Sequence, residues 1–241
     1  MDLVLLALAA FSTALMSATL GLGGGVLLIL LMPGLLPSAA IIPVHAVVQT
    51  MANCARVGFS LRYVDWPLVP PLLIGSILGA YLGSHGAAFI SLQWLPAVAG
   101  FIILVVTWLP MSRIKMSGQG ALVMLGFYQT GLGMLAGATG PLGAAVMQRI
   151  NTRRDWLVVN TGLYMALNHL LRTVAFALIG FTFEPWWPEI LAMSLATIPG
   201  AWLGTQLRYW VPQQNFTHIF RWLISLLALR MIALTFWDQS T

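Results

Sequence analysis

Two stretches of apolar sequence carry polar side chains at the spacing of one helical face. In the first stretch the intervals are four, four and three residues, with His45, Gln49, Asn53 and Arg56. Residues at this spacing share one side of a helix. Guanidinium and amide groups donate hydrogen bonds to oxyanions, and an imidazole exchanges protons near neutral pH. This face therefore has the chemistry of an anion site with a proton acceptor.

The second stretch has the same character. Its intervals are three, four and four residues, with Thr161, Tyr164, Asn168 and Arg172. We predict that Arg56 and Arg172 bind the charge of an anion and that Asn53 and Asn168 orient it. His45 and His169 are candidates for proton coupling, with histidines held only by neighbouring helices as the alternative.

The depth of the arginines decides whether they can face a binding site. Arg172 lies about eight residues from the end of its predicted span, which is about 12 Å at the helical rise. A charge at that depth costs about 2 to 3 kcal/mol, so it should face protein or a wet cavity. The alternative is that either arginine extends to the lipid headgroups.

Two glycine-rich segments interrupt the apolar sequence. They are Gly-Leu-Gly-Gly-Gly at 21–25 and Gly-Ala-Thr-Gly-Pro at 137–141. Each glycine costs about 1 kcal/mol in a helix, so broken helices are expected, with close helix packing as the alternative. A restarted helix presents free N–H groups that attract an anion. The predicted substrate-binding glycines and threonine are Gly23, Gly24, Gly25, Gly137, Thr139 and Gly140.

The composition requires a membrane to position these residues. Of 241 residues, 59% are hydrophobic and 7% are charged, far below the charge of a soluble domain. Spans of about 20 apolar residues suit the bilayer core. We predict an all-α polytopic membrane protein of about eight transmembrane helices, near residues 3–20, 39–61, 67–83, 92–109, 120–136, 156–180, 187–207 and 217–237.

The chain reads as two repeated halves. Gly-Ala-Tyr-Leu-Gly at 79–83 recurs as Gly-Ala-Trp-Leu-Gly at 200–204, and Arg56 recurs as Arg172 after 116 residues. We therefore predict a first transmembrane repeat at 1–110, a connecting loop at 111–118 and a second repeat at 119–241. Duplicated halves with interrupted helices are typical of secondary transporters, and parallel and inverted arrangements both remain open.

Motifs for other functions are missing from the sequence. There is no zinc-protease, Walker or nucleophile-elbow motif, so an enzyme is not predicted. No cofactor or metal site is expected, and the single Cys54 cannot form an internal disulfide. Eleven basic residues are too scattered for a nucleic-acid surface. The segment 149–155 is predicted to be a solvated loop.

A family resemblance rests on the glycine segment at 21–25, its weaker counterpart at 137–143, the repeated Gly-Ala-aromatic-Leu-Gly and the eight-span layout. Together these features resemble the sulfite exporter TauE/SafE family, also called the 4-toluene sulfonate uptake permease family. The resemblance covers nearly the whole chain. It implies transport of sulfite, sulfonates and similar anions across the prokaryotic cytoplasmic membrane without ATP hydrolysis. The second glycine segment departs from the family pattern because it lacks a glycine triplet.

These observations predict a secondary transporter of small anions, with sulfite or organosulfonates and other organic acids as the cargo, in the inner membrane of the cell. A passive anion channel is the alternative, because the same residues would line it. The expected partners are a small anion and the lipid bilayer. A coupling proton or sodium ion and a homo-oligomer are both compatible with the sequence.

Overall fold

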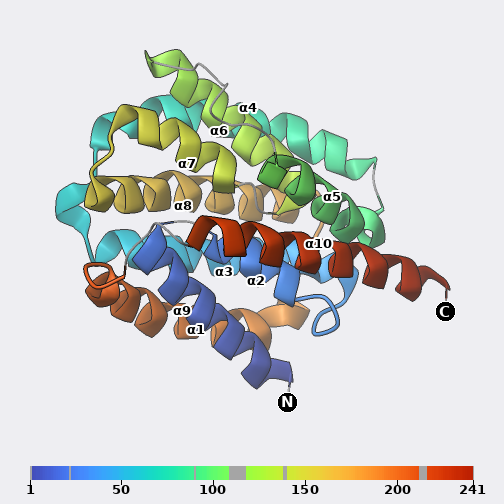
Figure 1. The fold of residues 1–241 in the computed structure, drawn as a ribbon. Coiled ribbons are helices and arrows are strands. Elements are labelled where there is room, and N and C mark those ends of the chain that lie inside the picture. Colours follow the sequence, from blue (N-terminus) through green and yellow to red (C-terminus); the bar gives the residue numbers. More distant parts are fainter. Residues whose placement is uncertain are drawn as a thin grey trace.

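The computed structural model describes residues 2–21, 23–89, 91–108, 118–137, 140–211 and 216–240. Within these residues the chain is helical and has no β-strand (Figure 1). The helices of the first half are α1 (Asp2–Leu20), α2 (Gly24–Leu31), α3 (Ser38–Gly58), α4 (Val69–Ala88) and α5 (Leu95–Trp108). Those of the second half are α6 (Gly118–Ala136), α7 (Gly140–Ile150), α8 (Arg154–Leu178), α9 (Trp187–Leu207) and α10 (Phe216–Ser240). The predicted all-α fold is confirmed, and the eight predicted spans correspond to all of these helices except α2 and α7.

The first glycine segment ends α1 and reverses the chain. Gly21 and Gly23 have φ angles of 87° and 94°, a backbone conformation that favours glycine. Gly24 then lies against α1, since a Cβ added there would be 2.1 Å from both Thr13 O and Ser17 Oγ. These two residues precede the end of α1 by one to two turns. The short helix α2 therefore runs back alongside α1.

The second glycine segment does the same to α6. Gly137 has a φ of 67°, and α7 begins at Gly140. A Cβ added to Gly143 would be 2.9 Å from Nε2 of Gln129, which lies two turns before the end of α6. The short helix α7 therefore also turns back, and both predicted helix breaks are present. Thr139 lies outside the described residues, as does most of the predicted loop at 111–118.

Equivalent helices of the two halves run in opposite directions. The end of α3 lies near the start of α8, where the backbone N–H of Asp65 donates to Oδ1 of Asn160 at 2.8 Å. Helices α5 and α10 are also antiparallel, because Trp108 at the end of α5 donates from Nε1 to Ser225 Oγ at 3.0 Å, whereas Trp94 before α5 packs edge-to-face on Phe236 near the end of α10. Because α2 turns back along α1 and α7 turns back along α6, each of these helix pairs ends on the side where it began. The three helices that follow in each half then cross the bundle an odd number of times. The halves are thus inverted relative to each other, which the sequence left open.

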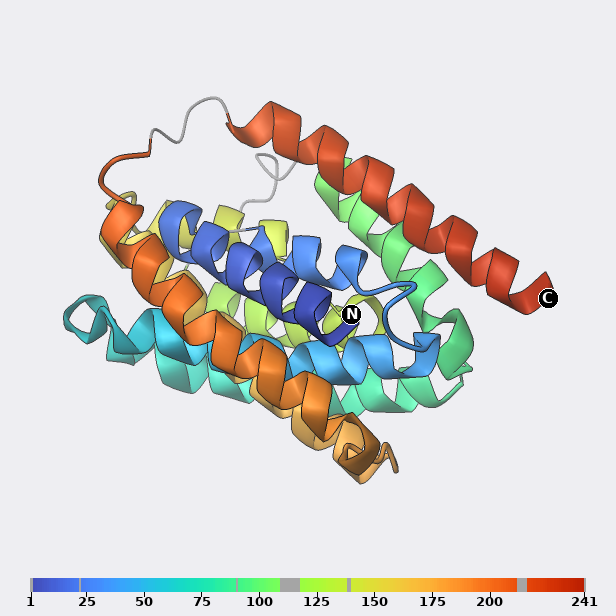
Figure 2. The ribbon, with the colours of Figure 1, turned by 90° about the horizontal axis from the view of Figure 1, so that it is seen from below.

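Glycines join the two halves by close backbone packing. Helix α4 packs along α6, and α9 packs along α1 (Figure 2). The distance from an added Cβ to a backbone oxygen of the facing helix would be 1.9 Å for Gly75, 2.2 Å for Gly79, 2.4 Å for Gly200 and 2.3 Å for Gly204. A side chain at any of these positions would push the helices apart. Close helix packing through a missing side chain is therefore the role of these four glycines.

The outer surface of the bundle is apolar. Exposed large side chains gather on α4, α9 and α10, including Ile77, Leu195, Trp222 and Leu226. Four helices, α1, α3, the α4 region and the α9 region, are long and apolar enough to cross a membrane among the described residues. Apolar side chains outside and polar side chains inside are the arrangement that a lipid environment requires. The molecule is a polytopic membrane protein.

Candidate functional site

The polar faces of α3 and α8 meet in the interior of the bundle. Their buried members are His45, Gln49, Asn53 and Arg56 on α3 and Thr161, Tyr164, Asn168, His169 and Arg172 on α8. The exposed fraction is 1% for Arg56 and 3% for Arg172. Neither arginine extends to the lipid headgroups, so that alternative is wrong. A buried charge of this kind in a membrane protein marks a functional site by default.

Arg56 binds the backbone at the end of α1. Its Nη1 donates to the carbonyl of Ser17 at 3.1 Å and to that of Gly21 at 3.3 Å. Its Nη2 donates to Oδ1 of Asn53 at 2.7 Å, while Nε is buried without a partner. A Cβ added to Gly162 would be 2.6 Å from Nε, so the absence of a side chain there makes room for the guanidinium.

Arg172 makes the corresponding contacts at the end of α6. Its Nη1 donates to the carbonyl of Gly133 at 2.7 Å and to that of Gly137. Its Nη2 contacts the ring nitrogens of His169, and Nε is again buried without a partner. Every partner of Arg172 lies 116 residues after the equivalent partner of Arg56.

Helix ends explain why an arginine occurs at each break. The last carbonyls of a helix have no partner within the helix and carry partial negative charge. In a membrane interior no bulk water satisfies them. A guanidinium supplies several donors and a positive charge at that point. Each buried arginine therefore stabilises a broken helix in addition to any role in binding.

The two guanidiniums do not lie side by side. Arg56 lies against Gly162, and Arg172 is ten residues further along α8. That separation is about 15 Å along the helix axis. Inverted halves therefore place these equivalent residues toward opposite ends of the α3–α8 pair, each at its own helix break. The sequence spacing indicated a shared face but not this separation.

Asn53 and Asn168 are not equivalent partners. Asn53 holds Arg56 and donates from Nδ2 to the Gln49 carbonyl at 2.7 Å. Asn168 instead accepts from Ser76 Oγ at 2.7 Å and from Thr130 Oγ1 at 2.9 Å, which ties α8 to α4 and α6. The residue 116 positions after Asn53 is His169, and it holds Arg172 as Asn53 holds Arg56.

The two histidines connect the breaks. His45 Nε2 lies 2.8 Å from the carbonyl of Gly25 in the first turn of α2, and His45 Nδ1 is buried without a partner. The ring centroids of His45 and His169 are 5.4 Å apart in an edge-to-face arrangement. A short chain of contacts thus runs from Gly25 through both imidazoles to Arg172 and the end of α6.

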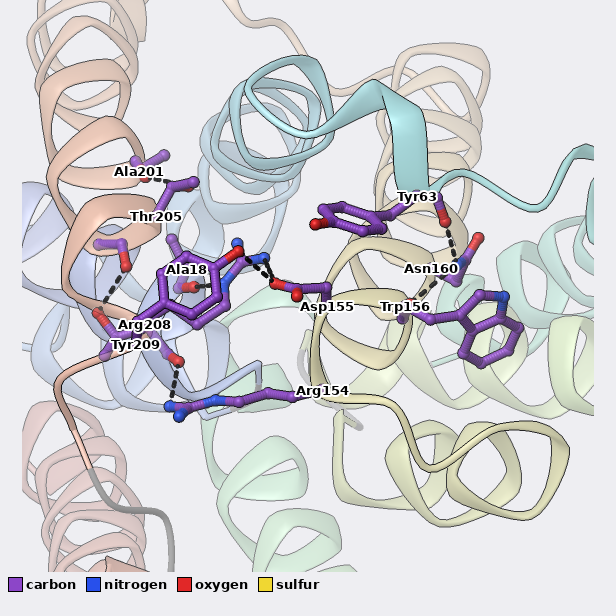
Figure 3. A network of polar contacts seen from close by, with 12 residues as sticks. Ala18, Tyr63, Arg154, Asp155, Trp156, Asn160, Ala201, Thr205, Arg208 and Tyr209 are labelled. Atoms are coloured by element: carbon purple, nitrogen blue, oxygen red, sulfur yellow. Dashed lines mark hydrogen bonds and ion pairs between the residues drawn. The ribbon is translucent and has the colours of Figure 1, made fainter.

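A second polar cluster, which the sequence did not reveal, surrounds the end of α1 (Figure 3). Arg208 Nε donates to the Ala18 carbonyl at 3.0 Å, and Arg154 Nη2 donates to the Thr19 carbonyl at 3.0 Å. Asp155 accepts from Arg208 Nη1 at 3.1 Å and from the Tyr209 hydroxyl at 3.2 Å. The prediction of a solvated loop is therefore wrong for Arg154 and Asp155. The contact between Asp155 and Arg208 joins residues 53 positions apart, and no local sequence pattern indicates such a contact.

The comparisons place these features in a family. Among the described residues, no group of three His, Cys, Asp or Glu side chains is arranged to hold a metal ion. No curated protein and no solved structure was found to match the chain. The family model described as sulfite exporter TauE/SafE matches residues 6–231. The chain therefore belongs to the sulfite exporter TauE/SafE family, whose members are membrane transporters of sulfur-containing anions rather than enzymes.

Proposed function

We propose that this protein is a secondary transporter that carries a small oxyanion, sulfite or an organosulfonate, across the cytoplasmic membrane. The observation that carries the proposal is the burial of Arg56 and Arg172 with neutral partners only. Within the described residues, neither guanidinium contacts a carboxylate, whereas Arg208 forms an ion pair with Asp155. A positively charged interior without a compensating acid favours an anion over a cation.

The free donors of these arginines support an oxyanion as cargo. Each arginine keeps a buried Nε without a partner, next to an Nη2 whose partner is a side chain. The Nε and Nη2 groups form one edge of the guanidinium, and this edge binds two oxygens of a planar or tetrahedral oxyanion. Sulfite and sulfonate groups both present such oxygens.

The inverted halves support alternating access. Transporters with inverted repeats carry substrate near the middle of the bilayer, where broken helices of the two halves meet. In this protein Gly21 lies against Val158 of α8, and Gly137 lies against Ile29 of α2 and Ile42 of α3. Both breaks therefore lie at the α3–α8 interface. Movement of one half against the other would expose this interface to each side of the membrane in turn.

The test is counterflow in liposomes. Purified protein is reconstituted, the liposomes are loaded with unlabelled sulfite, and entry of labelled sulfite is followed. A carrier exchanges the two pools with saturable kinetics, whereas a channel gives no counterflow and a flux that follows voltage. The absence of counterflow for sulfite and for methanesulfonate would refute the proposed function.

The variant Arg172→Gln tests the site within the same assay. We expect its kcat/KM to fall at least about 100-fold, the typical cost of removing a buried charged partner. Arg172→Lys keeps the charge but loses the forked geometry and should fall in between. The matched control is Arg62→Gln, which removes an exposed arginine outside the buried faces and should transport normally. Unchanged transport by Arg172→Gln would exclude its assigned role.

A further inference from the structure

The two buried arginines differ in one partner. Nη2 of Arg56 donates to the amide oxygen of Asn53, and Nη2 of Arg172 contacts the imidazole of His169 at the equivalent position. All their other side-chain contacts correspond, including two helix-end carbonyls on Nη1 and an unpartnered Nε. An amide does not titrate, whereas an imidazole does. The inverted halves are therefore alike in geometry and unlike in chemistry at this one position.

The contact between Arg172 and His169 exists only while His169 is neutral. A guanidinium has donors and no acceptor, so a ring nitrogen of His169 must offer a lone pair. A protonated imidazole has two N–H groups and a positive charge, and it would repel Arg172. Protonation therefore ends the contact and releases Nη2. Because Nε is already free, the whole Nε–Nη2 edge of Arg172 then becomes available while Nη1 stays on the α6 carbonyls.

We infer that His169 takes up one proton together with each anion, and that the Nε–Nη2 edge of Arg172 is the anion-binding site. This inference rests on the proposed transport function. Arg56, whose partner Asn53 cannot be released by a proton, caps α1 and does not bind the cargo. The proton comes from water on the side to which the site is open, and it is returned to water when the anion leaves on the other side.

Charge balance favours the joint entry of the two ions. A monoanionic sulfonate and a proton add no net charge to the interior, whereas either ion alone adds one unit where charge is costly. Transport of this pair is electroneutral. It should therefore follow a pH gradient and be insensitive to membrane voltage.

The charged and titratable neighbours of His169 are few. Arg172 is on the same helix, and His45 and Arg56 face it from α3. His45 is the competing proton acceptor, because its Nδ1 is buried without a partner. It makes no contact with Arg172, however, and its Nε2 is held by the Gly25 carbonyl. A proton on His45 would not release the guanidinium of Arg172. Substitutions of His45 and His169 should therefore have different effects on transport.

The first experiment measures the apparent KM for sulfite counterflow between about pH 6 and pH 8 in matched variants. His169→Asn copies the partner that Asn53 provides in the other half. Since sulfite titrates equally in every sample, a difference in pH dependence between variants reports on the protein. We expect the KM of the wild type to rise by up to about tenfold per pH unit relative to that of His169→Asn. Equal slopes in the two proteins would overturn the inference.

Two further variants locate the proton. His45→Gln keeps a donor for the Gly25 carbonyl and should retain the pH slope of the wild type, whatever its rate. Loss of the slope in His45→Gln with retention in His169→Asn would overturn the assignment. His85→Asn, which changes an exposed histidine outside the cluster, is the control for histidine removal. If the wild-type protein shows counterflow but the pH slopes are equal, only this inference fails. If the wild-type protein shows no counterflow, the proposed function fails.

A second measurement needs no variant. Methanesulfonate stays ionised across this pH range, so any proton that moves with it comes from the protein and not from the ligand. We expect the purified wild-type protein to take up about one proton per bound methanesulfonate in weakly buffered detergent solution. In liposomes an acidic exterior should drive its accumulation, and a sodium gradient should not. Binding without proton uptake would overturn the inference.

Discussion

Both helix breaks leave backbone carbonyls without partners inside the helix, and the described arginine contacts to these carbonyls are more numerous at the first break than at the second. At the first break, Arg56, Arg154 and Arg208 bind four carbonyls between Ser17 and Gly21. At the second break, Arg172 binds the carbonyls of Gly133 and Gly137. The first break is thus anchored several times over. At the second break the same arginine that holds the carbonyls through Nη1 offers, by our inference, its Nε–Nη2 edge to the anion, so anchoring and binding are combined there.

The largest expected effect of this difference is in amide hydrogen exchange. Two additional charge-assisted bonds and an ion pair should stabilise the first break by about 2 to 3 kcal/mol against local opening. Amides of residues 133–143 should therefore exchange roughly 100-fold faster than those of residues 17–27 in the wild-type protein. Mass spectrometry of exchanged peptides measures both regions at once. Equal protection, or greater protection at the second break, would contradict the comparison.

A smaller effect is expected when the first break loses one anchor. Arg208→Gln removes a donor to the Ala18 carbonyl and the ion pair with Asp155, and it should raise exchange near the end of α1 about tenfold. Asp155→Asn removes only the ionic part and should act more weakly. Neither change should alter exchange at the second break. The control is Arg62→Gln, and an effect of Arg208→Gln spread over the whole chain would show that its role is not local.

The smallest effect is expected from adding one methyl group beside each arginine. Gly133→Ala places a Cβ 2.8 Å from Arg172 Nη1, and Gly162→Ala places one 2.6 Å from Arg56 Nε. Both guanidiniums must shift slightly, at a cost of about 1 kcal/mol. Gly133→Ala should raise the KM for sulfite several-fold, whereas Gly162→Ala should lower thermal stability with little change in KM. The reverse pattern would exchange the roles of the two arginines.

Much of this arrangement was predictable from the sequence. Apolar composition and glycine interruptions gave the helices and their breaks, because the energetics of both are local. The spacing of His45, Asn53 and Arg56 predicted a buried polar face, and the 116-residue shift predicted that Arg172 would mirror Arg56. These inferences depend on helical periodicity and on the internal repeat. Both can be read from a single sequence.

The remaining features depend on how helices meet. The reversal of α2 against α1 follows from contacts of Gly24 with Thr13 and Ser17, and no local pattern gives that direction. Without it, the sequence could not tell that the guanidiniums are at opposite ends of the α3–α8 pair. The contacts of Asp155 with Arg208 and of Asn168 with Ser76 join distant segments. Such pairs are invisible to spacing rules within one helix.

The glycine packing of α4 on α6 and of α9 on α1 means that the halves are interleaved. Each half supplies bare backbone that only the other half covers. Neither half would be stable alone in a bilayer. A single-repeat ancestor would have had to insert in both orientations and assemble as an antiparallel dimer.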